Sequence, residues 1–326
     1  SPSLTDDALS EDDKAANDFL NREENGDFAI SDLTIHAISV SGAIGGTAGV
    51  GVAVAVVTLG TNAIATVGGS VEDAATLTVR AVSDYANIVA ATLSVGGGFV
   101  GVDASAAAVT YEGTTRASIE GTGRILGVGT VTLETIASGS VAVAAAGLAG
   151  GAVAVNAGVA VALNRSLVET FIAQGVTVGS GNKATAPNLN LLSTVTSNAR
   201  AFTVGVTGGA VAVGAAVAVV ILEPTVHTYL GAAPGTSAGG DPAVRGEIAA
   251  NQITITNDIT TEAASYAARI TGGAIAVTPQ VLLVFNRTDA YAGINRINVE
   301  AAGKIAIDGY LDANAKSYVA QLTGAA

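Results

Sequence analysis

Residues 208–213 read Gly-Gly-Ala-Val-Ala-Val, and this element decides the fold because it recurs along the chain. The first glycines of the other copies are Gly45, Gly97, Gly150, Gly272 and Gly324. Successive first glycines are separated by 52, 53, 58, 64 and 52 residues. Internal repetition at such a period is the signature of a repeat architecture, in which each unit buries its apolar face against its neighbours.

Two further features keep a nearly constant distance from each glycine pair. A strand-forming triplet, such as Ile253-Thr-Ile, precedes the pair by 19 or 20 residues after the first copy, and an apolar residue, such as Ile294, follows it by 22. We therefore expect a β-repeat domain over residues 33–326, made of about six units of about 42 residues with variable linkers. The units lie near 33–67, 77–119, 131–172, 189–230 and 253–294, with a partial unit at 305–326.

The segments around the glycine pairs are apolar enough to resemble membrane helices, since residues 202–222 hold no charged side chain. Valines at 211, 213, 217 and 219 nevertheless alternate with small residues at the period of two that is typical of a strand. A glycine pair inside a helix is also costly, and no Trp or Lys/Arg belt marks a membrane interface. We expect an all-β chain that does not span a membrane.

Two all-β architectures fit this pattern. The first is a parallel β-solenoid in which each repeat forms roughly two coils, and the alternative is a stack of long antiparallel hairpins that turn at Gly-Gly. In either, small residues on both faces of a strand let backbone layers approach closely. A second break is expected 14 residues after the first glycine, at Asn164-Arg-Ser and Asn286-Arg-Thr. These triplets match a glycosylation acceptor, but we interpret them as turns, which Asn favours.

The composition excludes several classes of function. The 326 residues have a mass of only 31.7 kDa, with 41 Gly and no Cys, Met or Trp. Disulfides and thiolate sites are therefore impossible, and a net charge of −13 argues against nucleic acid as a partner. The two histidines, His36 and His227, are expected to be structural or exposed, and the carboxylates of the repeats form no acid–base pair. We expect that the chain is not an enzyme.

The acidity is concentrated at the N-terminus. Residues 1–32 hold ten Asp and Glu against Lys14 and Arg22, and a capping pattern at Ser10 predicts a short helix. The loop that follows resembles a calcium-binding loop of the EF-hand or dockerin type, with Gly26 at the sharp turn. Its candidate ligands are Asn21, Glu23, Asn25, Asp27 and Asp32. The alternative is an acidic, solvated linker with an Asn-Gly turn.

Aromatic residues form two columns across the repeats. Phe202, Tyr266 and Tyr318 lie six residues before their glycine pairs, and Phe171, Tyr229 and Tyr291 lie 19 to 21 after. A repeated column is more often a packing ladder than a ligand-binding face, so we favour packing over glycan binding.

The Gly-Gly-x-Val-x-Val element, the Asn-Arg-[Ser/Thr] triplet and the strand-forming triplet resemble the repeats of giant bacterial surface proteins. These are the filamentous-haemagglutinin-like and leukotoxin-type filamentous adhesins, with Gly/Ala/Val-rich β-strand repeats. The resemblance covers residues 33–326 and implies an extended scaffold that is extracellular or anchored at the bacterial cell surface. It transfers no catalytic residue.

We therefore expect a structural protein, the repeat segment of an adhesin or stalk. One alternative is a self-assembling fibre subunit, joined by strand complementation of the incomplete repeat at 305–326. A second alternative is a calcium-dependent or glycan-binding surface module. The expected partners are copies of the chain or flanking repeats, with a surface glycan or host receptor as a further class.

Overall fold

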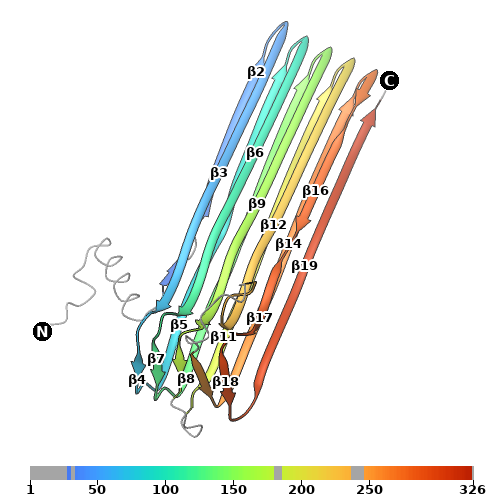
Figure 1. The fold of residues 1–326 in the computed structure, drawn as a ribbon. Coiled ribbons are helices and arrows are strands. Elements are labelled where there is room, and N and C mark those ends of the chain that lie inside the picture. Colours follow the sequence, from blue (N-terminus) through green and yellow to red (C-terminus); the bar gives the residue numbers. More distant parts are fainter. Residues whose placement is uncertain (1–27, 31–33, 180–185, 236–245, 325–326) are drawn as a thin grey trace, which may run out of the picture.

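The computed structural model describes residues 28–30, 34–179, 186–235 and 246–324, and every helix or strand assigned within these ranges is a β-strand. Long strands run along a blade-shaped molecule, with successive copies side by side (Figure 1). All strand pairs between copies are parallel, as in β8–β11 and β9–β12. The expected β-solenoid-like stack is confirmed, and the antiparallel hairpins are excluded.

The strands form three sheets, two long and one short. Sheet A contains β1 (Phe28–Ile30), β2 (Thr34–Ile44), β5 (Thr76–Gly97), β8 (Thr130–Gly150), β11 (Asn188–Gly208), β14 (Gln252–Gly272) and β19 (Ile305–Gly324). Sheet B contains β3 (Ala48–Val67), β6 (Val100–Ile119), β9 (Val153–Ala173), β12 (Val211–Gly231), β15 (Ile275–Val277), β16 (Gln280–Asn286) and β17 (Asp289–Asn295). Sheet C contains β4 (Val71–Glu72), β7 (Arg124–Leu126), β10 (Thr177–Val178), β13 (Glu247–Ala250) and β18 (Asn298–Ala301).

Each repeat forms one coil rather than the two that we expected. The chain runs along a sheet A strand, turns at the glycine pair, returns along sheet B and reaches the next copy through sheet C. The expectation was wrong because each long sheet accepts a strand of about 20 residues without a break: β11 pairs with β14 residue for residue, from Asn188↔Gln252 to Gly208↔Gly272. We call the glycine-pair end of the blade the tip and the sheet C end the base.

The interpretation of Asn164 as a turn was also wrong. Asn164 lies inside β9 and is fully buried, and its amide donates hydrogen bonds to the Tyr85 hydroxyl (3.1 Å) and to Ser197 Oγ (2.9 Å). These partners satisfy the amide within the blade, so the strand continues. Asn286, by contrast, is the last residue of β16, and a break does separate it from β17.

The glycine pairs form a ladder at the tip. The second glycine donates its backbone N–H to the first glycine of the next coil, from Gly151 to Gly208 (3.1 Å) and from Gly209 to Gly272 (3.0 Å). A Cβ on Gly209 would overlap the carbonyl oxygen of Gly151, and a Cβ on Gly273 would overlap that of Gly209. Glycine is required there because neighbouring coils approach too closely for any side chain.

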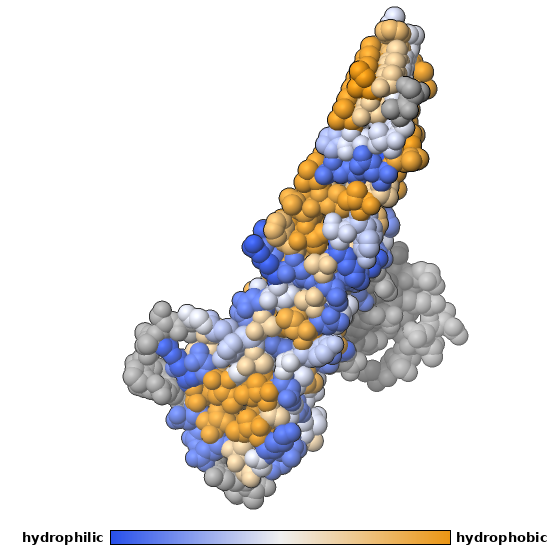
Figure 2. All heavy atoms as spheres, turned by 90° about the vertical axis from the view of Figure 1, so that its right-hand side faces the viewer, coloured by the Kyte–Doolittle hydropathy of each residue, from blue (hydrophilic) through white to orange (hydrophobic). Residues whose placement is uncertain are grey.

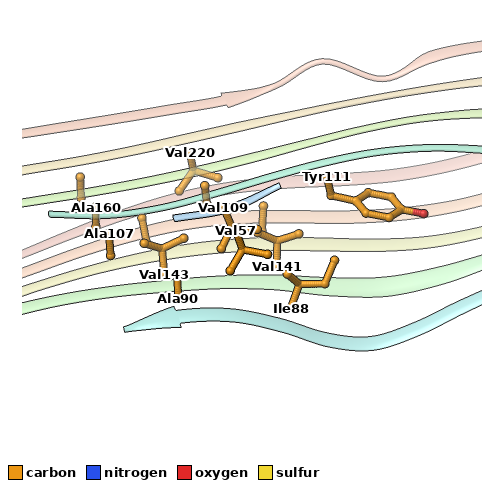
Figure 3. Close-up of a cluster of buried hydrophobic side chains, with 14 of the residues drawn as sticks. Val57, Ile88, Ala90, Ala107, Val109, Tyr111, Val141, Val143, Ala160 and Val220 are labelled. Atoms are coloured by element: carbon orange, nitrogen blue, oxygen red, sulfur yellow. The ribbon is translucent and has the colours of Figure 1, made fainter. Parts of the chain in front are cut away.

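The interior of the blade becomes thinner from base to tip. Large residues such as Leu133 and Ile172 fill the base, where sheet C closes a third side. A second cluster with Ile88, Val109 and Tyr111 lies between sheets A and B (Figure 3). Near the tip a Cβ on Gly51 would overlap the carbonyl oxygen of Val95 in the facing sheet. The expected close approach of backbone layers is thus confirmed for the tip.

Candidate functional site

The outer surface of sheet B is divided by one row of residues that runs across the strands. Strand pairing aligns Gly60, Glu112, Arg165 and Glu223 in this row, which we call the boundary row. On its base side the outward positions include charged side chains, such as Arg116 and Glu169, beside apolar ones, such as Ile64. On its tip side the outward positions carry no charge. The two halves therefore present different chemistry to the surroundings.

A groove of about 790 Å³ follows the boundary row. Gly60, which has no side chain, lies in its lining, together with Glu112, Arg165 and Glu223. The charges beside it neutralise one another: Arg165 contacts Glu223 (Nε–Oε2 3.0 Å) and, more distantly, Glu112 (Nη1–Oε1 3.9 Å). Each charge in the row faces an opposite charge on the neighbouring coil, so the row links the coils through ion pairs. Exposed ion pairs of this type contribute about 0–1 kcal/mol each to stability.

The same cross-coil pairing recurs towards the base and on sheet A. Arg116 Nε lies 2.9 Å from Glu169 Oε2 on sheet B, and Arg80 Nε lies 2.8 Å from Glu134 Oε2 on sheet A. Lys316 pairs with Glu262 at 3.2 Å, and this contact raises the pKa of the lysine. The charged side chains of the basal half thus connect coil to coil rather than converging on one point.

On the tip side of the boundary row, sheet B exposes an apolar surface that we call the distal face. It consists of Ala48, Val50, Val52, Val54, Val56, Thr58, Val100, Val102, Ala104, Ala106, Ala108, Thr110, Val153, Val155, Ala157, Val159, Val161, Leu163, Val211, Val213, Ala215, Val217, Val219, Ile221, Ile275, Val277, Val281, Leu283 and Phe285. Val56 is 64% exposed and Phe285 is 39% exposed. Figure 2 shows apolar surface along the upper part of the blade, seen from the end formed by the last coil.

The interior behind the distal face carries the polar groups instead. Asp103, Asn156 and Arg269 are each at most 2% exposed. Asn156 donates to Asp103 Oδ2 at 2.6 Å and accepts a hydrogen bond from the Arg269 guanidinium, which also donates to the Ala215 carbonyl. Burial lowers the pKa of Arg269 to about 10 and raises the pKa of Asp103, and the attraction between the two charges opposes both shifts.

Glycines make room for this polar network. A Cβ on Gly147 would overlap the Asp103 carboxylate, and a Cβ on Gly205 would overlap the Arg269 guanidinium. In the distal half, small and polar residues therefore point inward while valines point outward. This is the reverse of the usual distribution in a water-soluble domain.

The first aromatic column is a packing ladder, as expected, but Tyr291 does not join the second column, because the strand register aligns it with His227 rather than with Tyr229. The rings of Phe202 and Tyr266 stack at 4.6 Å between centroids, and those of Tyr266 and Tyr318 stack at 5.2 Å. In the second column Phe171 and Tyr229 stack at 4.9 Å. Stacking covers the ring faces that adjoin neighbouring coils, which is the packing role that we favoured.

The remaining candidate residues are scattered. His36 is exposed on β2, whereas His227 on β12 packs edge-on against Tyr291, with its Nε2 3.7 Å from Asp289 Oδ2. The calcium candidates Asn21, Glu23, Asn25, Asp27 and Asp32, and the N-terminal helix, lie outside the described residues. Among the residues that are described, no group of three or more His, Asp or Glu side chains could hold a metal ion.

Sequence reasoning missed the boundary row and the buried network. A usable signal was present: Asp103 and Asn156 occupy the alternate strand positions to the neighbouring valines, so they face the opposite side. Comparison with protein-family models, curated proteins and solved structures gave no match. In the part of the chain that is described, no helix has the length and hydropathy of a membrane span.

Proposed function

We propose that the chain is a structural segment of an extracellular or bacterial cell-surface protein, an adhesin repeat or stalk, and that it performs no catalysis. The observation that carries the proposal is the strand register, which runs unbroken over about 20 residues in each of the long sheets. Each added coil pairs in parallel with the one before it and extends the stack by about 4.8 Å. Length is then set by the number of coils, which suits a spacer.

The side chains support the same function. Ion pairs such as Arg80–Glu134 and stacked rings such as Phe202–Tyr266 connect equivalent positions on successive coils. Inside, Thr135 bonds to Thr170 (2.6 Å) and to Ser193 (3.0 Å), so hydroxyl contacts join strands of different coils and different sheets. These contacts resist separation and shearing of coils, which a segment under mechanical load requires.

Surface exposure on intact cells of the source organism tests the proposal. An antibody raised against the purified chain should label intact cells, and added protease should remove the label. An antibody to a cytoplasmic protein is the control, because it should label only permeabilised cells. Labelling of this chain that appears only after permeabilisation would contradict a surface location.

A second proposal is a fibre subunit in which copies join end to end. It is supported by the sheet edges at the two ends of the stack, where β3 and β19 each pair with one neighbouring strand among the described residues. Such edges accept a further strand, from additional coils or from a second copy. Negative-stain microscopy over a concentration series should show filaments along the stacking direction. Stable single blades at the highest concentration would contradict the fibre.

A third proposal, a calcium-dependent module, rests on the acidic loop at residues 21–32. Calorimetric titration with calcium should give heat with the full chain and none with a chain lacking residues 1–32. Absence of heat in both would remove the calcium proposal.

A further inference from the structure

We propose that the distal face of sheet B is a self-association surface, on which two copies of the chain pack face to face. This inference deepens the proposed structural function, on which it rests: coils lengthen a stalk, and paired faces would join stalks side by side. The proposal depends on the size of the face, its self-complementary chemistry and the position of the boundary row.

The area of the face fits a stable dimer. Five strand positions spaced about 4.8 Å apart give a width of about 24 Å. Along β12 the face extends over the eleven residues from Val211 to Ile221, which at about 3.3 Å per residue is about 36 Å. Their product is roughly 860 Å² per copy, or about 1,700 Å² for a pair, which lies within the standard range for specific interfaces.

The chemistry of the face suits a second copy of itself. Its outward side chains are Val, Ala, Ile, Leu and Phe, with Thr58 and Thr110 as the exceptions, and none is charged. Rows of valine cross the strands in register, as in Val50↔Val102↔Val155↔Val213. Two such pleated faces can interdigitate at the separation of about 10 Å that is usual between stacked sheets. No charge loses its water when they meet.

The boundary row sets where this contact ends. Glu112 and Arg165 have side chains that are 65% and 48% exposed, and they lie immediately beyond the last row of the distal face, at Thr110 and Leu163. Sliding a second copy towards the base would cover these charges at a cost in desolvation. The contact is therefore confined to the distal half of the blade.

Lipid is a poorer occupant of the same face. The face is bounded by β3 on one side and by β15 and β16 on the other, and none of these strands has an outer neighbour among the described residues. Immersion in hydrocarbon would leave their outer N–H and C=O groups without partners, at several kcal/mol for each group. Packing against a second copy leaves those edges in water, where they remain hydrogen-bonded.

Sedimentation velocity of the full chain over a concentration series tests the proposal. Wild-type chain should form a concentration-dependent dimer. Val159→Lys places a charge at the centre of the face, on the middle strand β9, and should weaken the dimer by roughly tenfold or more. Val204→Lys is the comparison on the outer face of sheet A, which also exposes apolar side chains such as Val206 and Ile270, so the pair of variants distinguishes the two faces; Val159 and Val204 are 38% and 48% exposed. Val204→Lys should leave the dimer within about threefold of wild type.

A cross-linking experiment identifies the contact independently. The chain has no Cys, so Val159→Cys introduces a single reactive position, which a short bis-maleimide should join between two copies. Val204→Cys should remain uncross-linked. The proposal would be overturned if the wild-type chain were monomeric, or if the two lysine variants dimerised equally. It would also be overturned if the wild-type chain floated with phosphatidylcholine vesicles and Val159→Lys abolished that flotation. None of these results bears on surface labelling of cells, so failure here is distinguishable from failure of the proposed function.

Discussion

The glycine ladder at the tip makes a prediction that two adjacent residues can test. Gly209→Ala places a Cβ against the carbonyl oxygen of Gly151, whereas a Cβ on Gly208 meets nothing within 4 Å. The obstacle at Gly209 is backbone of the neighbouring coil, which cannot rotate away as a side chain could. Alanine at 209 must therefore push two coils apart at the tip, and alanine at 208 need not.

The expected loss of stability follows from the contacts that must shift to make room for the new Cβ. Overpacking of a close contact costs about 1–3 kcal/mol. Separating these two coils also weakens the hydrogen bonds between them, from Gly151 to Gly208 (3.1 Å) and from Val211 to Ala152 (3.0 Å), each contributing about 1 kcal/mol. We expect Gly209→Ala to lower the free energy of unfolding by about 2–5 kcal/mol. Gly208→Ala should be nearly neutral or slightly stabilising, by up to about 1 kcal/mol, because alanine restricts the unfolded chain.

Urea denaturation followed by circular dichroism measures both variants under the same conditions. The free energy should be compared only if the denaturant slope is unchanged, since repeat proteins can unfold in parts. Equal costs for the two alanines, or a larger cost at Gly208, would refute the assignment of Gly209 to the inter-coil contact. That result would also contradict the strand register on which the assignment of one coil to each repeat depends.

Three further experiments test the interior, the boundary row and the buried network. Val220→Ala removes buried methyl groups and should lower the free energy of unfolding by about 2 kcal/mol, measured by denaturant unfolding. Val219→Ala, on the distal face, should lower it by less than about 0.5 kcal/mol in dilute monomer. A larger cost at Val219 than at Val220 would indicate a strand register shifted by one residue. Glu223→Gln should cost at most about 1 kcal/mol, and the cost should shrink in high salt if the ion pairs of the row are responsible. Asp103→Asn replaces a carboxylate whose ionised form is unfavourable in the folded chain, because burial raises its pKa, and it keeps an acceptor oxygen for Asn156, so the variant should be at least as stable as the wild type at neutral pH. Since burial raises the pKa of Asp103 above its unfolded value, the contribution of this group to stability falls as pH rises through the carboxyl range, and the stability–pH profile of the variant should lack that decline.

The all-β repeat could be predicted because its signal is local and repeated. Val211 and Val213 alternate with small residues, and the spacing from triplet to glycine pair hardly varies, so strand, period and tip position all follow from the sequence. The number of coils per repeat did not follow. Whether a strand continues past Asn164 depends on Tyr85 and Ser197, which lie on other coils and are brought to its amide only by the stacking.

The short strands of sheet C illustrate a different limit. β4 and β10 contain two residues each, which is too few for any periodicity to be recognised. They are strands because the coils on either side hold them in register, as Val178 is held between Ile125 and Ile248. The sequence analysis placed these residues in the variable linkers between units, and packing between coils rather than a local pattern makes them strands.

The inverted distribution of polar and apolar residues in the distal half follows from the taper of the blade. Where the two sheets touch backbone to backbone at Gly51 and Val95, the interior has no volume for a valine, so strand alternation leaves the large side chains only the outer surface. A polar side chain such as Asn156 can occupy the interior because glycines at 147 and 205 open space beside it and because hydrogen bonds satisfy its amide. The distal half therefore buries less apolar surface by itself than the base does. Contact with another apolar face would recover that burial, which is why we expect the thin end of the blade to be where copies meet.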